Sequence, residues 1–113
     1  MKNQKNAIKI LHVFLDEKFF DGAARFFMEL PGVENLFYFY SKNPKKFKYI
    51  KNEEVITRIS KWKDYKSLFK DPHIDIIYFH SIPVNNYKLF KYIDSQKIVI
   101  WWSWGYDIYN SYG

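Results

Sequence analysis

The sequence predicts an α/β domain built on a mainly parallel sheet of about five strands. Short runs of apolar and β-branched residues recur along its 113 residues, and the segments between them carry apolar residues at helical spacing. Strands that alternate with helices in this way form right-handed βαβ units, whose strands lie parallel. A hydrophobic fraction of 48% is enough to bury a core. The expected fold is therefore a single Rossmann-like three-layer domain over residues 1–113.

The first strand is expected over Ile8–Phe14, where β-branched and apolar residues follow a polar leader. Asp21 has the character of a helix N-cap, because apolar residues follow it at helical spacing. Pro31-Gly32 ends this helix, and Leu36–Tyr40 forms the second strand.

The second half of the chain continues the alternation. The pattern between Lys45 and Thr57 leaves two positions open for a short edge strand, Tyr49–Lys51 or Glu54–Thr57. A helix is then expected over Lys61–Lys70, with apolar residues on one face and Asp71-Pro72 at its end. Three elements remain, in chain order: the strand Ile74–His80, a helix that starts near Pro83–Asn86, and the strand Lys97–Trp102.

Composition excludes several kinds of site. The absence of cysteine rules out disulfides, thiolate metal sites and a cysteine nucleophile, and neither a cofactor nor a metal is expected. The longest charge-free apolar stretches, Leu36–Tyr40 and Ile98–Tyr106, are far shorter than the roughly 20 residues of a membrane-spanning helix. The polar N-terminus lacks the apolar region of a secretory signal. The expected compartment is therefore the cytoplasm, with the inner face of the cytoplasmic membrane as a peripheral site.

The net charge of +6 comes from one segment. Residues 42–70 hold ten basic and three acidic side chains, whereas the flanking segments are close to neutral. Such a segment is either a solvated surface or a patch that faces an anionic membrane, and Phe47 and Tyr49 at its edge suit an interface. Nucleic acid is not an expected partner, since Trp62 and Tyr65 fall on the core face of a helix and no nucleic-acid motif is present.

Ligands of an open parallel sheet bind at the carboxyl ends of its strands. The first candidate segment, Leu15–Asp21, carries Asp16 and Lys18 but no glycine-rich phosphate loop, so it is either a solvated loop or a helix N-terminus that faces an anion. In the second, His80 ends an apolar strand with Ser81 beside it, and this histidine is either structural or a titrating group of a site. His12 is expected to be packed within its strand.

The third candidate segment, Ser103–Tyr109, follows the last strand. Three tryptophans lie within four residues here, and core packing accounts for one or two of them. Beyond the strand, Trp104, Gly105 and Asp107 suit a sugar: a ring for its face, a backbone that allows close approach, and a carboxylate for its hydroxyls. All three candidate segments are expected to meet at one edge of the sheet.

The same residues carry a resemblance to a known family. Trp104-Gly105-Tyr106-Asp107-Ile108-Tyr109 resembles the Trp-Gly-Ala-Asp-Leu-Tyr motif of the 4-acetamido-4,6-dideoxygalactose (Fuc4NAc) transferases, glycosyltransferase family 56. Three further patterns agree in order and rough spacing, with serine in place of the family's glycine in the last: Leu11-His12-Val13, Arg25-Phe26-Phe27 and His80-Ser81.

The resemblance implies the N-terminal half of a two-domain, metal-independent GT-B-type glycosyltransferase, and the end of the chain at Gly113 fits such a fragment. It implies a nucleotide-sugar donor held by the C-terminal half and a lipid-linked sugar acceptor on this side. The candidates for the base that removes the acceptor proton are Asp107, His80 and Asp16. The candidates for substrate binding are Trp104, Gly105, Tyr106, Ser81 and Lys18. The alternative is a stand-alone flavodoxin-like module without catalytic activity; a phospho-receiver is disfavoured, because the central strand ends in His80 and not in an aspartate.

Overall fold

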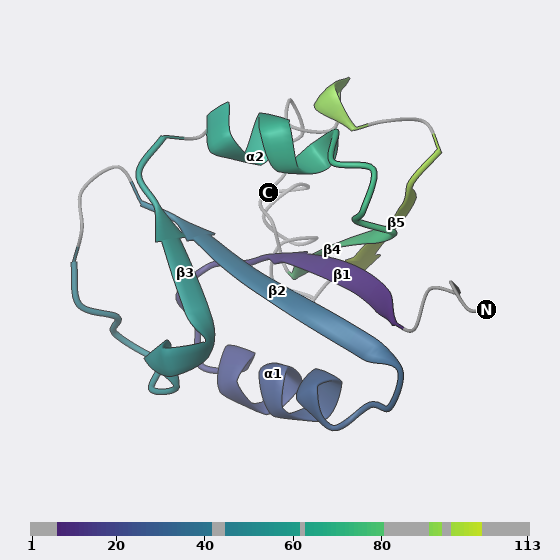
Figure 1. Cartoon of the computed structure of the whole chain (residues 1–113). Coiled ribbons are helices and arrows are strands. Elements are labelled where there is room, and N and C mark those ends of the chain that lie inside the picture. The colour runs from purple at the N-terminus through teal and green to yellow at the C-terminus, as the bar shows by residue number, and fades with distance from the viewer. Residues whose placement is uncertain (1–6, 42–44, 62, 81–90, 94–95, 103–113) are drawn as a thin grey trace, which may run out of the picture.

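The computed structural model describes residues 7–41, 45–61, 63–80, 91–93 and 96–102, and it confirms the predicted α/β class (Figure 1). Five strands form one sheet in the order β3-β2-β1-β4-β5, and every neighbouring pair is parallel. The strands are β1 (Ile8–Val13), β2 (Val33–Tyr40), β3 (Ile56–Ile59), β4 (Ile76–His80) and β5 (Ile98–Trp102). The helical elements are α1 (Phe20–Met28), the short 3₁₀ helix η1 (Glu53–Val55) and α2 (Lys63–Phe69).

The strand order reverses between β1 and β4. The chain runs outward from β1 to β2 and β3, returns across the sheet through α2, and continues from β4 to β5 on the other side. β1 therefore lies at the centre, where His12 is aligned with Phe37 of β2 and with Tyr78 of β4. In an open α/β sheet this reversal opens a crevice beyond the carboxyl ends of the two central strands. The β1–β4 boundary is thus the natural place for a ligand.

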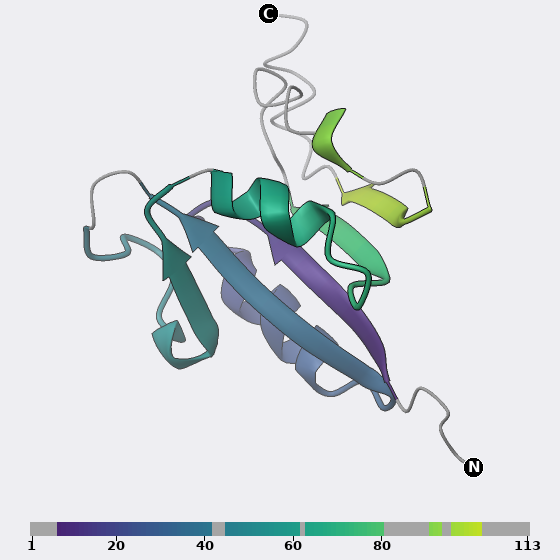
Figure 2. The same cartoon turned by 45° about the horizontal axis from the view of Figure 1, so that its top comes forward.

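The two helices cover opposite faces of the sheet, which gives the expected three layers (Figures 1 and 2). Residues alternate in direction along each strand, so the sheet feeds two separate cores. On the α2 face the buried residues are Leu11, Val13, Tyr65, Phe69, Ile74, Ile77 and Phe79. On the α1 face they are Phe14, Phe20, Ala24, Phe37 and Ile50. Tyr65 also fastens α2 to β2, since its hydroxyl donates to the Tyr38 carbonyl at 2.9 Å and accepts from the Tyr40 N–H at 3.1 Å.

The first helix begins differently from the prediction. Phe19 occupies the N-cap position without a side-chain hydrogen bond, and Asp21 lies inside the first turn. The Asp21 carboxylate instead accepts the backbone N–H groups of Lys51 and Asn52, at 2.9 and 3.2 Å. The prediction of Asp21 as N-cap is therefore wrong, because its side chain serves a loop 30 residues away. The expected stop at Pro31-Gly32 is present as a turn, with Gly32 at a φ of 74°.

The edge strand β3 forms at one of the two positions expected for it. β3 overlaps Glu54–Thr57, whereas Tyr49–Lys51 is not a strand. The reason is that the N–H groups of Lys48, Tyr49 and Ile50 all donate to the carboxylate of Asp16 and are not available to a sheet. The helix expected to start near Pro83–Asn86 falls mostly outside the described residues, as does Trp62. Within the described part of the chain, no helix combines the length and the apolar character needed to cross a bilayer.

The outer strand β5 is apolar yet exposed. Ile98 is 60% exposed and Trp101 is 46% exposed, so neither is a core residue. The expected core packing of one or two tryptophans is thus not met at Trp101, and for Trp102 and Trp104 it lies outside the described side chains. β5 is held at its start by Lys97, whose Nζ donates to the carbonyl oxygens of Asp71 and Ile74. The edge strand β5 thus contains no charged residue, and neither α1 nor α2 covers its exposed side chains.

Candidate functional site

Two histidines meet at the point where the strand order reverses. His12 is the next-to-last residue of β1 and His80 is the last residue of β4, and both lie on the α1 face of the sheet. The Nδ1 atom of His12 is 2.8 Å from the Nε2 atom of His80. His12 is fully buried and His80 is 3% exposed. The geometry therefore brings together His12, which was expected only to pack within its strand, and His80, which was expected at the carboxyl edge of the sheet.

Asn35 of β2 extends this pair into a chain of hydrogen bonds. Its Oδ1 atom lies 2.8 Å from Nε2 of His12, and its Nδ2 atom donates to the carbonyl oxygen of Phe27 in α1 at 3.0 Å. Aromatic rings enclose the chain: the His12 ring stacks on Phe37 at a centroid distance of 4.4 Å and meets the edge of Phe27 at 4.7 Å. The result is a polar line across three strands inside an aromatic shell.

The apolar surroundings keep both imidazoles neutral. Burial lowers the pKa of His12 from 6.5 to about 4, and the bond to Asn35 opposes this only in part. Burial, together with the neighbouring charge that His12 would carry, lowers the pKa of His80 from 6.5 to about 3. At neutral pH each ring therefore has one N–H donor and one unprotonated nitrogen. Such a pair can accept a hydrogen bond from a ligand, but it carries no charge with which to attract an anion.

Asp16, a predicted catalytic residue, is occupied elsewhere. Its carboxylate accepts the N–H groups of Lys48, Tyr49 and Ile50, at 2.5, 3.0 and 3.1 Å. These bonds hold a loop whose Ile50 side chain is buried in the core under α1. Lys18, a predicted substrate ligand, is exposed, with its ammonium 5.4 Å from the Phe19 ring centre. Neither residue joins the histidine pair through any contact that the structure describes.

The remaining predicted site residues lie outside the described residues. These are Ser81, Trp104, Gly105, Tyr106 and Asp107. Two of the three candidate segments are placed: Leu15–Asp21 follows β1 and His80 ends β4, at the same edge of these neighbouring parallel strands. Because Ser103–Tyr109 lies outside the described residues, the meeting of all three stays a prediction.

Sequence reasoning missed Asn35 and assigned His12 no partner. Both are polar residues inside strands whose other inward positions are apolar, which is a signal for a buried polar group that needs a partner. A search for such groups would have singled out both residues. It would not have paired them with His80, because that contact depends on which strand lies beside β1.

No other arrangement in the described part of the chain competes with this cluster as a site. No group of three or more histidine, aspartate or glutamate side chains is placed there to hold a metal ion. An open cleft beside α1 contains none of the predicted site residues, and side chains of both charges line it. The lining residues are Asp21, Arg25, Met28, Glu29, Lys51 and Asn52.

Comparison of the chain with protein-family models, with curated proteins and with solved structures finds no match.

Proposed function

We propose that this chain is the acceptor-side N-terminal domain of a GT-B-type glycosyltransferase, which moves a deoxy-amino sugar from a nucleotide donor to a lipid-linked saccharide. One observation carries the proposal. Three of the segments that resemble family 56 are far apart in sequence, yet one residue from each meets in a single cluster. His12 contacts Phe27 ring to edge and lies within hydrogen-bond distance of His80. Such a convergence is what residues of one functional site require.

The chemistry of the cluster suits the acceptor better than the donor. A nucleotide diphosphate needs N–H donors or cations around its phosphates, usually from a glycine-rich loop or a helix N-terminus. The sequence has no such loop, and the two histidines are neutral. A neutral imidazole at the end of a strand instead accepts a hydrogen bond from a sugar hydroxyl. With Asp16 engaged by backbone N–H groups, His80 and Asp107 are the base candidates that we retain.

Ligand binding to the 113-residue chain tests whether this domain binds the acceptor and not the nucleotide donor. A saccharide on a short, water-soluble prenyl diphosphate should bind and shift the imidazole resonances of His80 in NMR spectra. The same prenyl diphosphate without its sugar is the matched control and should leave His80 unmoved. Calorimetry should detect no micromolar binding of nucleoside diphosphates, because the sequence has no glycine-rich phosphate loop and the two histidines of the cluster are neutral. Micromolar nucleotide binding, or a response to nucleotide alone, would favour a stand-alone binding module instead.

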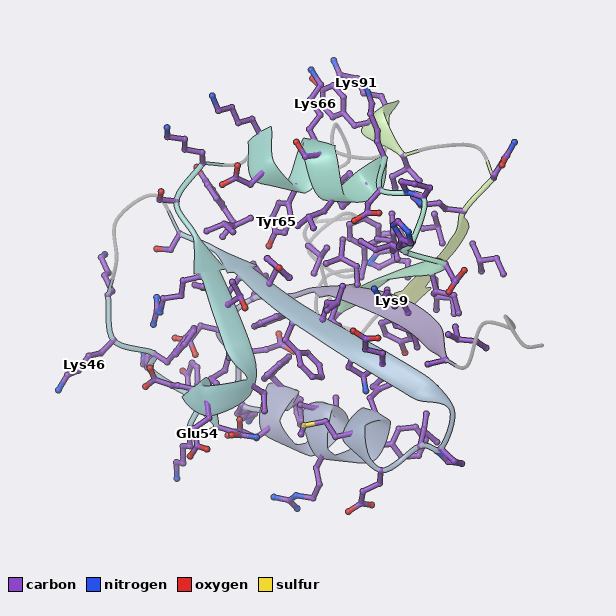
Figure 3. The ribbon with its side chains drawn as sticks, in the orientation of Figure 1. Lys9, Lys46, Glu54, Tyr65, Lys66 and Lys91 are labelled. Carbon is purple, nitrogen blue, oxygen red and sulfur yellow. The ribbon has the colours of Figure 1, made fainter. Side chains whose placement is uncertain are left out.

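The lipid-linked acceptor implies work at a membrane surface, and the basic residues bear on this. They do not lie on one face: Lys46 projects from the loop before β3, whereas Lys66 and Lys91 project beyond α2 (Figure 3). Lys63, Lys66 and Lys70 are exposed on or just after α2, where Asp64 is the single acidic residue of the helix. We therefore propose α2, and not the whole segment 42–70, as the membrane-facing surface.

Vesicle co-sedimentation separates the two groups of lysines. Replacing Lys63, Lys66 and Lys70 with serine should weaken binding to anionic vesicles about a hundredfold, because each lysine near an anionic leaflet contributes about 1 kcal/mol. The matched control replaces Lys45, Lys46 and Lys48, which are exposed in the segment between β2 and η1, and should change little. Binding should also weaken between about 0.1 M and about 1 M salt, as the screening length shortens. Equal losses in the two triple variants, or equal binding to neutral vesicles, would count against α2.

A further inference from the structure

We propose that Asn35, His12 and His80 form a hydrogen-bond chain of fixed direction, which holds His80 as its Nε2–H tautomer and presents its Nδ1 atom to a ligand hydroxyl at the β1–β4 boundary. In this arrangement Asn35 and His12 are positioning residues, and His80 is the group that meets the ligand. The inference rests on the proposed function only for the identity of the hydroxyl, which would be that of the acceptor saccharide. The direction of the hydrogen bonds follows from the geometry and from the neutral state of the two buried rings.

A backbone carbonyl sets the direction at one end. The oxygen of Phe27 can only accept, so the Asn35 atom 3.0 Å away must be the amide nitrogen, which donates. The other amide atom of Asn35 is then its oxygen, and it accepts from Nε2 of His12 at 2.8 Å. His12 therefore carries its proton on Nε2. Because the ring is neutral, its Nδ1 has a lone pair and no proton.

The same reasoning passes to the second ring. The unprotonated Nδ1 of His12 lies 2.8 Å from Nε2 of His80, so Nε2 of His80 must be the donor. Neutral His80 then has its lone pair on Nδ1. Each of the three bonds thus fixes the next, and a carbonyl of α1 determines the tautomer of a residue two strands away, at the end of β4.

The Nδ1 atom of His80, at the end of the hydrogen-bond chain, makes the cluster a candidate ligand site. Among the residues that the structure describes, none donates to Nδ1 of His80, although the side chain is 3% exposed. A buried acceptor without a donor costs about 1–3 kcal/mol, a cost that proteins tolerate where a ligand supplies the missing donor. A hydroxyl is such a donor, whereas an ionised phosphate offers only acceptors. The chemistry therefore favours a ligand that bears a hydroxyl, such as a saccharide, over a phosphate.

Tautomer-resolved NMR of the ligand-free 113-residue chain tests the direction. Long-range proton–nitrogen correlation spectra should show both His12 and His80 with a protonated Nε2 and an unprotonated Nδ1. His73, which is exposed, reports in the same spectrum as an internal reference. The variant Asn35→Leu removes the anchor and should replace the single tautomer of His80 by a mixture, while the His73 signals stay unchanged. Asn35→Asp, which restores an acceptor oxygen, should restore the Nε2–H form of His12.

The ligand part of the inference has its own readout. The sugar-bearing prenyl diphosphate should move the Nδ1 resonance of His80, and Asn35→Leu should weaken its binding about tenfold, the value of about one hydrogen bond. Inorganic phosphate should have no effect. A protonated Nδ1 in the free wild-type chain, or a His80 tautomer indifferent to Asn35→Leu, overturns the hydrogen-bond chain whatever the function; the wild-type spectrum decides this even where the variant does not fold. The stated tautomers without any response to saccharide overturn the acceptor assignment in both proposals.

Discussion

Acidification from about pH 7 to about pH 5 is expected to lower the free energy of unfolding by about 4 kcal/mol. The unfolded chain binds a proton at each histidine near pH 6.5, whereas burial lowers the folded-state pKa of His12 to about 4 and of His80 to about 3. Between these values the unfolded state binds more protons than the folded state. Stability is therefore complete above about pH 6.5 and is lost as the pH falls, by about 1.4 kcal/mol per pH unit for each histidine.

Urea unfolding at several pH values measures this loss. The range from about pH 7 to about pH 5 lies above the usual pKa of aspartate and glutamate, so the two buried histidines dominate it. His80→Gln should roughly halve the slope of stability against pH, at some cost in stability at neutral pH. The matched control is His73→Gln, which replaces an exposed histidine outside the pair, and the loss due to His12 and His80 should remain in this variant. A stability that does not vary over this range would show that the His12–His80 pair is not buried in the folded protein.

The variant Asp16→Asn is expected to destabilise the domain by about 2–3 kcal/mol. An amide keeps the shape of the carboxylate but replaces one acceptor oxygen with a donor, and it removes the negative charge. At least one of the N–H groups of Lys48, Tyr49 and Ile50 then loses its acceptor. Because Ile50 is buried under α1, the loop cannot withdraw into water without also opening that core.

Thermal unfolding checks the role of Asp16, with a midpoint lowered by about 10 °C expected for a domain of this size. Glu54→Gln is the control, since Glu54 is an exposed carboxylate of η1, and its midpoint should stay within about 2 °C of the wild type. A catalytic Asp16 would behave in the opposite way. Its asparagine variant would keep the melting temperature and lose transferase activity in the protein that carries both domains.

The strands were predictable because their signal is local. β1, β4 and β5 begin within about two residues of the expected positions, since each is a run of apolar and β-branched residues between polar breaks. The roles of Asp16 and Asp21 were not predictable in the same way. Their partners lie about 30 residues further along the chain, in a segment whose own pattern indicated at most a short edge strand. A carboxylate after a strand suggests a cap or a site, and nothing nearby reveals a distant loop.

The candidate site was predictable in part. The position of His80 at the end of an apolar strand singled it out, since ligands collect at that edge of a parallel sheet. Its bond to His12 was hidden, because it requires β4 to lie beside β1, and the strand order is a property of the whole chain. The role of Asn35 could not be predicted for the same reason. It also depends on the Phe27 carbonyl of α1, which accepts a hydrogen bond from the Asn35 amide.

The reversal of strand order also dictates when the parts of the cluster become available during synthesis on a ribosome. His12 emerges first and Asn35 follows 23 residues later, but His80 comes 68 residues after His12. Until then one edge of the central strand β1 has no neighbour. The partial sheet of β1, β2 and β3 therefore leaves an open edge with which other nascent chains can pair. Completion of β4 closes that edge and supplies the second histidine in one event. A growing chain that pauses before this point therefore exposes both an unpaired strand edge and an imidazole that still lacks its partner.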